Sequence, residues 1–176
     1  MRKTITVFGS SLPVEGEEEY SVAYKLGGLL AKNNFDVCTG GYMGIMEAVS
    51  RGAVENGGKA EGVTLSYLNF KCNNYLTNNI KCSTLFERIT TLIEKGDAYI
   101  ILQGGTGTLL ELAAVWEFMN KNLLNIKPIV CHSYMWKEVA RIIDEQIVKE
   151  KRISGLVKYF DAPEEIADYL VKNLKD

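Results

Sequence analysis

Residues 98–111 have the sequence AYIILQGGTGTLLE, which predicts a strand, a turn and a helix in direct succession. Residues 98–102 carry apolar or aromatic side chains at every position, which is typical of a strand buried on both faces of a parallel sheet. Residues 103–105 form the turn, and residues 108–111 form the first turn of a helix that the apolar spacing predicts over 106–122. A strand that is buried on both faces requires further strands and helices around it.

The rest of the chain repeats this alternation of short β-branched runs and longer segments of helical period. Strands are predicted over residues 5–8, 35–39, 60–65, 80–83, 128–131 and 157–160, and helices over 17–33, 44–56, 86–95, 134–149 and 163–174. The alternation predicts a Rossmann-like, doubly wound α/β fold, with one parallel sheet, helices on both faces, and residues 1–176 as a single domain. Residues 66–79 are polar and are predicted to form an irregular surface loop or flap.

The composition is that of an ordinary globular protein, and it excludes several classes of function. Of the 176 residues, 47% are hydrophobic and 24% are charged, and the net charge of −2 is too near neutral for a nucleic-acid or anionic-membrane surface. No apolar run approaches the roughly 18 residues of a membrane-spanning helix. Four scattered cysteines without a CxxC pair, and a single histidine, disfavour a zinc site or a disulfide scaffold. We therefore expect a cytoplasmic protein that binds neither nucleic acid nor membrane and uses no metal or cofactor.

The glycine-rich turn is predicted to bind a phosphate group. Glycines leave no Cβ between the backbone amides and an anion, and the unpaired amides of a helix N-terminus point at that anion. The candidate phosphate-binding residues are Gly104, Gly105, Thr106, Gly107 and Thr108, of which the two threonines add hydroxyl donors. The loop is not a P-loop, because no Lys-Ser/Thr pair follows, and it is not GxGxxG, because Leu110 takes the place of the last glycine. The alternative is a tight β–α turn with Thr108 as the capping residue.

Two charged residues are candidates for chemistry near that loop. Glu111 lies one helical turn beyond Thr108, where its carboxylate can contact a sugar whose 5′-phosphate occupies the loop. In the alternative role, Glu111 closes a capping box. Arg88 lies near the start of the preceding helix, and its guanidinium can clamp a phosphate or a polar substrate edge with two hydrogen bonds. The alternative is a solvated arginine paired with a nearby acid, which the residues alone favour.

Small residues also follow two other predicted strands, at the end of the sheet where α/β proteins bind ligands. The candidate binding residues there are Gly9, Ser10, Ser11, Gly40, Gly41 and Gly44. They can offer donors to a ligand, or let a ribose or phosphate approach the backbone. Close packing of a helix against the sheet explains the same residues equally well, and the sequence leaves both explanations open.

These motifs resemble the LOG ("lonely guy") family over nearly the whole chain. The resemblance is carried by Glu87-Arg88, Asp97-Ala98 and the PGGxGTxxE pattern of 103–111, with 7–11, 40–53 and 127–130 in addition. Members of the family are Rossmann-like homodimers, long catalogued as lysine decarboxylases, that cleave cytokinin or adenosine 5′-monophosphates to free base and ribose 5-phosphate. The resemblance implies a homodimeric hydrolase of a nucleoside monophosphate such as AMP. Nothing marks the pyridoxal-bound lysine that a decarboxylase would need.

The resemblance also implies roles for particular residues. Glu111 matches the glutamate that contacts the ribose, and Arg88 matches the catalytic arginine. Gly41 and Gly44 match the second glycine cluster, and residues 105–108 match the phosphate loop. Cleavage of an N-glycoside builds positive charge on the sugar, which an ionised carboxylate can stabilise while it orients the attacking water. The guanidinium can steady the departing base or hold the phosphate.

Four positions depart from the plant-type pattern of the family. They are Leu85, which replaces a methionine of the base pocket, Ile89, Gln103 and Glu47. The replacement at Gln103 should matter little to phosphate binding, whereas the other three leave the base preference and the activity itself open. The alternative function is a non-catalytic protein that binds or carries a nucleotide or a molybdenum cofactor, since carriers of that cofactor share this general fold.

Overall fold

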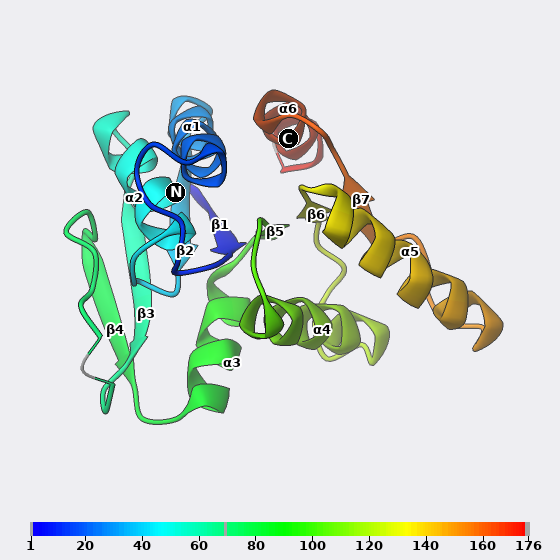
Figure 1. Cartoon of the computed structure of the whole chain (residues 1–176). Coiled ribbons are helices and arrows are strands. Elements are labelled where there is room, and N and C mark those ends of the chain that lie inside the picture. The colour runs from blue at the N-terminus through cyan, green and yellow to red at the C-terminus, as the bar shows by residue number, and fades with distance from the viewer. Residues whose placement is uncertain (1, 69, 175–176) are drawn as a thin grey trace.

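The predicted Rossmann-like α/β fold is confirmed. A computed structural model describes residues 2–68 and 70–174, so residues 1, 69, 175 and 176 of the predicted single domain lie outside the described part (Figure 1). The described strands are β1 (Lys3–Phe8), β2 (Phe35–Thr39), β3 (Ala60–Leu65), β4 (Asn78–Cys82), β5 (Ala98–Ile101), β6 (Ile129–Cys131) and β7 (Val157–Tyr159). The described helices are α1 (Glu18–Lys32), α2 (Ile45–Glu55), α3 (Leu85–Lys95), α4 (Thr106–Asn120), α5 (Tyr134–Lys149) and α6 (Pro163–Leu174).

The strands form one parallel sheet whose order reverses next to β1. The order is β4-β3-β2-β1-β5-β6-β7, and every neighbouring pair is parallel. The chain therefore moves outward from β1 to β4, returns to the centre, and moves outward on the other side from β5 to β7. In open sheets of this kind, the crevice outside the carboxyl ends of the strands at the reversal is the usual ligand site. Here that crevice lies beyond β1 and β5.

Helices cover both faces of the sheet because successive strand residues point to opposite sides. Ala98 and Ile100 of β5 belong to the core that α1, α2 and α6 cover, whereas Tyr99 and Ile101 belong to the core that α3, α4 and α5 cover (Figure 1). All four positions of β5 are buried. The central strand that the sequence predicted as apolar on both faces thus has a hydrophobic core on each side.

The helices α1 and α2 approach each other closely because glycines form their contact. A Cβ on Gly52 would lie 2.0 Å from the carbonyl oxygen of Tyr24, and a Cβ on Gly27 would lie 2.2 Å from the carbonyl oxygen of Val49. Because α2 begins directly after the glycine cluster at 40–44, this contact also fixes where that cluster lies.

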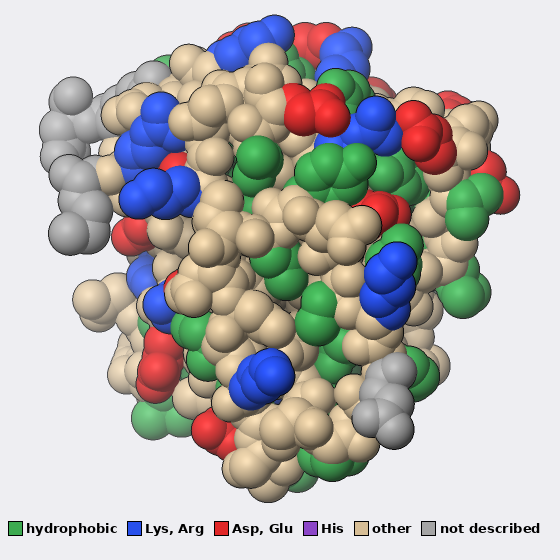
Figure 2. Space-filling view, turned by 90° about the vertical axis from the view of Figure 1, so that its left-hand side faces the viewer, with side chains coloured by type: hydrophobic (Ala, Val, Ile, Leu, Met, Phe, Trp, Pro, Cys, Tyr) green, Lys and Arg blue, Asp and Glu red, His purple; other side chains and the backbone are tan. Residues whose placement is uncertain are grey.

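One edge of the sheet differs from the sequence prediction. Asn78 and Asn79 pair with Glu61 and Gly62, so β4 starts two residues earlier than predicted and the preceding loop ends at residue 77. The loop is not wholly on the surface, because Asn73 is only 5% exposed. On the β4 side of the molecule, side chains of both charge signs are interspersed (Figure 2). Within residues 2–68 and 70–174, no helix combines the length and the apolar character that crossing a membrane requires.

Replacement of Gly52 by alanine tests the contact between α1 and α2. The new Cβ meets backbone atoms of Tyr24, which cannot rotate away, so Gly52→Ala is expected to lower the free energy of unfolding by about 1–3 kcal/mol. Gly28→Ala is the matched control in the same contact, because its Cβ would meet the end of the Asn56 side chain at 3.0 Å. Urea denaturation of both variants measures the difference, and equal stabilities would contradict the close contact.

Candidate active site

A cleft of about 700 Å³ opens at the carboxyl ends of β1 and β5, where the strand order reverses. This volume lies in the range of roughly 300–1,000 Å³ that is usual for small-molecule sites. The cleft is lined by the loops that follow β1, β2 and β3, by the first turn of α3 and by the start of α4. Five segments that are distant in sequence therefore line the same cleft.

The structure brings most of the predicted site residues together in this cleft. Those that line it are Gly9, Ser10, Ser11, Gly40, Leu85, Arg88, Gly105, Thr106, Gly107, Thr108 and Glu111. Of the four departures from the family pattern, only Leu85 lines the cleft, and Ile89 is buried in the core. Leu85 is therefore the one of these four residues that can contact a ligand in the cleft.

Three predicted binding residues, Gly41, Gly44 and Gly104, do not line the cleft and have packing roles instead. Gly41 and Gly44 have φ angles of 78° and 69°, which favour glycine, and a Cβ on Gly44 would lie 2.5 Å from the carbonyl oxygen of Ser10. A Cβ on Gly104 would lie 2.1 Å from Oγ1 of Thr108. For these three residues, the packing explanation that the sequence left open is the one that the structure supports.

The helix α4 presents an uncapped N-terminus to the cleft. It begins at Thr106, where the predicted helix over 106–122 begins, and in the described residues no side chain caps it. Thr108 is thus the third residue of the helix, which excludes its alternative role as the capping residue. A Cβ on Gly105 or Gly107 would meet no atom within 4 Å, so the space above both residues is open. Uncapped amides beneath open space are the arrangement that binds an anion at a helix N-terminus.

Arg88 and Glu111 meet in the wall of the cleft. Nη1 of Arg88 lies 3.5 Å from Oε1 of Glu111, and each residue is only 9% exposed. Nε of Arg88 also donates a hydrogen bond of 2.8 Å to the carbonyl oxygen of Val63. Arg88 is therefore not the solvated helix arginine of the alternative interpretation. The side chain of Glu111 pairs with Arg88, whereas in a capping box it would accept a hydrogen bond from the backbone.

Burial raises the pKa of Glu111 to about 7, and the nearby positive charge of Arg88 offsets only part of this rise. The cause is the loss of solvation, which disfavours the carboxylate relative to the neutral acid. A carboxyl group with a pKa near neutrality can both hold and release a proton under ordinary conditions. This is the property expected of a group that takes part in acid–base chemistry.

The sequence analysis missed Tyr42 and the part that the loop at 66–77 plays in the cleft. The ring centroid of Tyr42 lies 5.6 Å from Cζ of Arg88, and Phe70 stands edge-on to Tyr42 at 5.8 Å. Leu68, Phe70 and Lys71 of the loop line the cleft. An aromatic residue directly after the glycine pair at 40–41, together with the length of the loop, was the signal available in the sequence.

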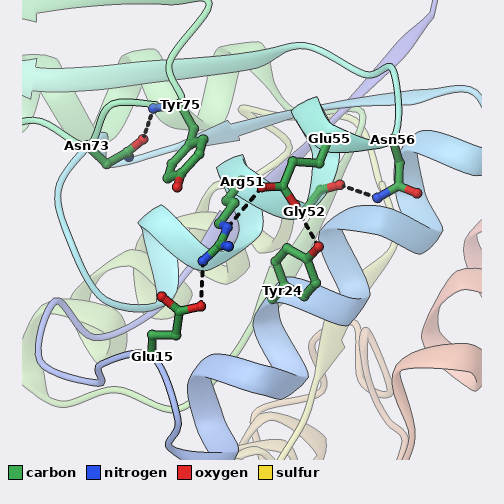
Figure 3. A network of polar contacts seen from close by, with 8 residues as sticks. All are labelled: Glu15, Tyr24, Arg51, Gly52, Glu55, Asn56, Asn73 and Tyr75. Atoms are coloured by element: carbon green, nitrogen blue, oxygen red, sulfur yellow. Dashed lines mark hydrogen bonds and ion pairs between the residues drawn. The ribbon is translucent and has the colours of Figure 1, made fainter.

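Arg51 of α2 ties together the two loops that flank the cleft (Figure 3). Its Nη1 lies 2.8 Å from Oε1 of Glu15, in the segment after β1, and its Nε lies 3.0 Å from Oε1 of Glu55. The guanidinium lies between the rings of Tyr24 and Tyr75, with Cζ 5.4 Å and 5.7 Å from their centroids. Tyr75 belongs to the loop at 66–77. The two rims of the cleft are therefore attached to one helix.

The fold, the cleft at the strand reversal and the Arg–Glu pair define a LOG-like α/β protein. The chain belongs to the SLOG cluster4 family, whose model matches residues 2–166. The predicted membership in a LOG-like family is thereby confirmed.

Three proteins with similar sequences match between 64% and 89% of this chain. A protein of Archaeoglobus fulgidus is 27% identical over 157 residues, which cover 89% of this chain and 88% of that protein. The cytokinin riboside 5′-monophosphate phosphoribohydrolase of Rhodococcoides fascians is 29% identical over 132 residues, 73% of this chain and 66% of its own length. The enzyme of the same name from Mycobacterium tuberculosis is 30% identical over 116 residues, 64% and 62% of the two chains. The match spans slightly less than two thirds of the length of both named enzymes.

Solved structures share the fold over the whole chain. The molybdenum cofactor carrier protein of Chlamydomonas reinhardtii has a TM-score of 0.80 at 19% identity, with both chains fully covered. The molybdenum cofactor binding protein of Rippkaea orientalis has a TM-score of 0.78 at 22% identity and covers 98% of this chain and 97% of its own. At these identities the likeness shows the fold alone.

The raised pKa of Glu111 predicts a specific dependence of stability on pH. Because the folded protein holds the proton of Glu111 more tightly than the unfolded chain, this group stabilises the fold at low pH, and its contribution is lost as the pH rises toward about 7. Glu111→Gln should remove this part of the dependence, so the stability of the variant relative to the wild type should rise between about pH 5 and about pH 8. Urea denaturation at about pH 5 and about pH 8 measures the effect.

Glu117→Gln is the control for this titration, because Glu117 is an exposed glutamate of the same helix that pairs with Arg152. A carboxyl carbon signal of Glu111 that titrates at the ordinary value of 4.5 would contradict the prediction. Arg88→Gln should move that titration to still higher pH, since it removes the positive charge that favours the carboxylate.

Proposed function

We propose that the protein hydrolyses the N-glycosidic bond of a nucleoside 5′-monophosphate, such as AMP or a cytokinin riboside monophosphate. The products are the free base and ribose 5-phosphate. The observation that carries the proposal is the buried Arg88–Glu111 pair beside an open, uncapped helix N-terminus. The names of relatives at 29% and 30% identity support the same reaction.

In this proposal the phosphate of the substrate lies on residues 105–108. The first amides of α4 point toward the open space above Gly105 and Gly107, and the partial positive charge of the helix N-terminus favours a dianion there. Glu111 lies one helical turn further along the same helix, so a ribose attached to this phosphate extends toward its carboxylate. The base then lies over the far side of the cleft.

The reaction breaks the C1′–N bond of the substrate and adds water to C1′. The bonding electrons leave with the base, which takes up a proton, and the hydroxyl group of water joins the sugar. Glu111 as a carboxylate stabilises the positive charge on the sugar and accepts the proton of the attacking water. Arg88 donates hydrogen bonds that steady the departing base, while its charge keeps part of the Glu111 population ionised.

The side of the cleft away from α4 favours an apolar base substituent. Met43, Met46, Leu65 and Leu85 line this side, and Phe70 lies at its rim. None of these side chains discriminates between bases by strong hydrogen bonds, so we propose that shape and apolar contact decide the base preference. An isopentenyl group on the base buries apolar surface there that AMP lacks.

We further propose that the protein is a homodimer and acts in the cytoplasm. Leu109 of α4 and Ile142, Ile143 and Val148 of α5 are exposed apolar residues, and a groove of about 310 Å³ runs between the two helices. In the described residues, the buried Nε1 of Trp116 in this groove has no hydrogen-bond partner. A second copy placed on this face would cover the apolar surface. The four free cysteines fit a reducing compartment.

Incubation of the purified protein with AMP and with isopentenyladenosine monophosphate tests the activity. Free base and ribose 5-phosphate are expected in equal amounts by chromatography. Glu111→Ala and Arg88→Ala should each lower kcat by roughly 10²–10³-fold, as the removal of one positioned electrostatic group does. Glu117→Ala on the same helix should retain wild-type activity.

No base release above the level of Glu111→Ala would contradict the hydrolase. Thermal shifts with the same nucleotides in the absence of turnover would favour the alternative, a nucleotide-binding or cofactor-carrier protein. Unchanged melting with every phosphate compound would contradict both.

The mass in solution tests the dimer. Light scattering after gel filtration should give about twice the 19.6 kDa of the chain. Ile143→Lys places a charge in the proposed interface and should yield monomers, whereas Asp168→Lys on the opposite face, in α6, should leave the dimer intact. A wild-type mass of one chain would contradict the proposed assembly.

A further inference from the structure

The guanidinium of Arg88 is positioned by more than its partner Glu111. The Arg88–Glu111 separation of 3.5 Å is at the outer limit of a hydrogen bond, so this contact alone does not orient the group. Nε is fixed by the carbonyl oxygen of Val63 at 2.8 Å. Nη2 lies over Gly40, where a Cβ would be only 1.9 Å away. The guanidinium also lies over the ring of Tyr42, with Cζ of Arg88 5.6 Å from the ring centroid.

Tyr42 itself is held at three points, all from other segments. Its hydroxyl oxygen accepts a hydrogen bond of 2.9 Å from the amide of Leu65, at the end of β3. Its carbonyl oxygen accepts a hydrogen bond of 2.9 Å from Nδ2 of Asn73. Phe70 packs edge-on against its ring. Two of these three contacts come from the loop at 66–77, so the loop limits how far Tyr42 can move.

The buried Asn73 is the point where that loop is attached to the glycine cluster. The backbone N–H of Asn73 donates a hydrogen bond of 3.0 Å to the carbonyl oxygen of Gly41, and its side chain donates to the carbonyl oxygen of Tyr42. Its Oδ1 accepts from the amide of Tyr75, whose ring packs against Arg51 (Figure 3). Hydrogen bonds made by a residue that is only 5% exposed are costly to break, so they hold the loop in one position relative to Tyr42.

We infer that Tyr42 is a positioning residue, which holds the Arg88 guanidinium beside Glu111 and connects it to the loop at 66–77. The face of the ring carries partial negative charge and attracts the cation, and Arg88 is only 9% exposed, so little water screens this contact.

Three variants separate the ring of Tyr42 from its hydroxyl group and from the loop in general. Tyr42→Phe keeps the ring and loses only the acceptor of the Leu65 amide, whereas Tyr42→Leu loses the ring. Tyr67→Leu is the control, because Tyr67 is an aromatic residue of the same loop that is 59% exposed and does not line the cleft. Should Tyr42→Leu fail to fold, Tyr42→Met supplies similar bulk without the aromatic face.

The first measurement is the ¹⁵N–¹H signal of Arg88 Nε, which needs no substrate. In the wild type, in Tyr42→Phe and in Tyr67→Leu, this proton should exchange slowly with water because it is buried and hydrogen-bonded to Val63. In Tyr42→Leu its exchange should accelerate by about tenfold or more, since the guanidinium gains freedom. Unchanged exchange in Tyr42→Leu, or equal acceleration in Tyr67→Leu, would overturn the inference.

The second measurement is kinetic and rests on the proposed function. With AMP as substrate, Tyr42→Leu should lower kcat on the order of 10–100-fold with KM nearly unchanged, as misplacement of a catalytic group does, and Tyr42→Phe should restore kcat. A wild-type kcat in Tyr42→Leu, or a loss confined to KM, would overturn the positioning role. If the wild type cleaves no nucleotide, the proposed function fails, and the exchange of the Arg88 proton still decides the inference.

Discussion

The burial of Arg88 and Glu111 against each other is the constraint on which the rest of the site depends. Removing two charges from water is costly, and their attraction offsets this cost only where the geometry is good and further hydrogen bonds are made. Here the separation is 3.5 Å, and burial still raises the pKa of Glu111 to about 7. The pair is thus kept with its acid partly neutral, an arrangement suited to proton transfer and poor as a source of stability.

Several features of the structure follow from the need to accommodate this pair. Gly40 leaves room for the guanidinium, Val63 of β3 supplies a carbonyl oxygen to it, and the ring of Tyr42 lies 5.6 Å from its Cζ. These three come from β3 and from the loop after β2, on the opposite side of the cleft from α4. The cleft at the strand reversal is therefore also where groups from both halves of the sheet meet.

The sequence predicted the fold well because each element carries its own local signal. The bounds of β2, β3 and α6 agree with the prediction to the residue, since glycine or proline punctuates them. The start of β4 was missed because Asn78 and Asn79 are polar residues of an edge strand, where pairing replaces burial as the stabilising term. The burial of Arg88 could not be predicted, because the atoms that surround it come from residues 40, 42, 63 and 111, and no local pattern records their meeting.

The glycines show how a structure can separate packing from binding where a sequence cannot. Gly41 and Gly44 adopt positive φ angles, and a Cβ on Gly104 would collide with Thr108, so the fold itself requires glycine at these three positions. Gly105 and Gly107 adopt no positive φ, and a Cβ on either would meet no atom within 4 Å. The fold provides no steric reason for glycine there. Both residues lie where the amides of α4 face the cleft, and a side chain would occupy the space that an anion needs. Under the proposed function, the reason for glycine at these two positions is a ligand that approaches the backbone.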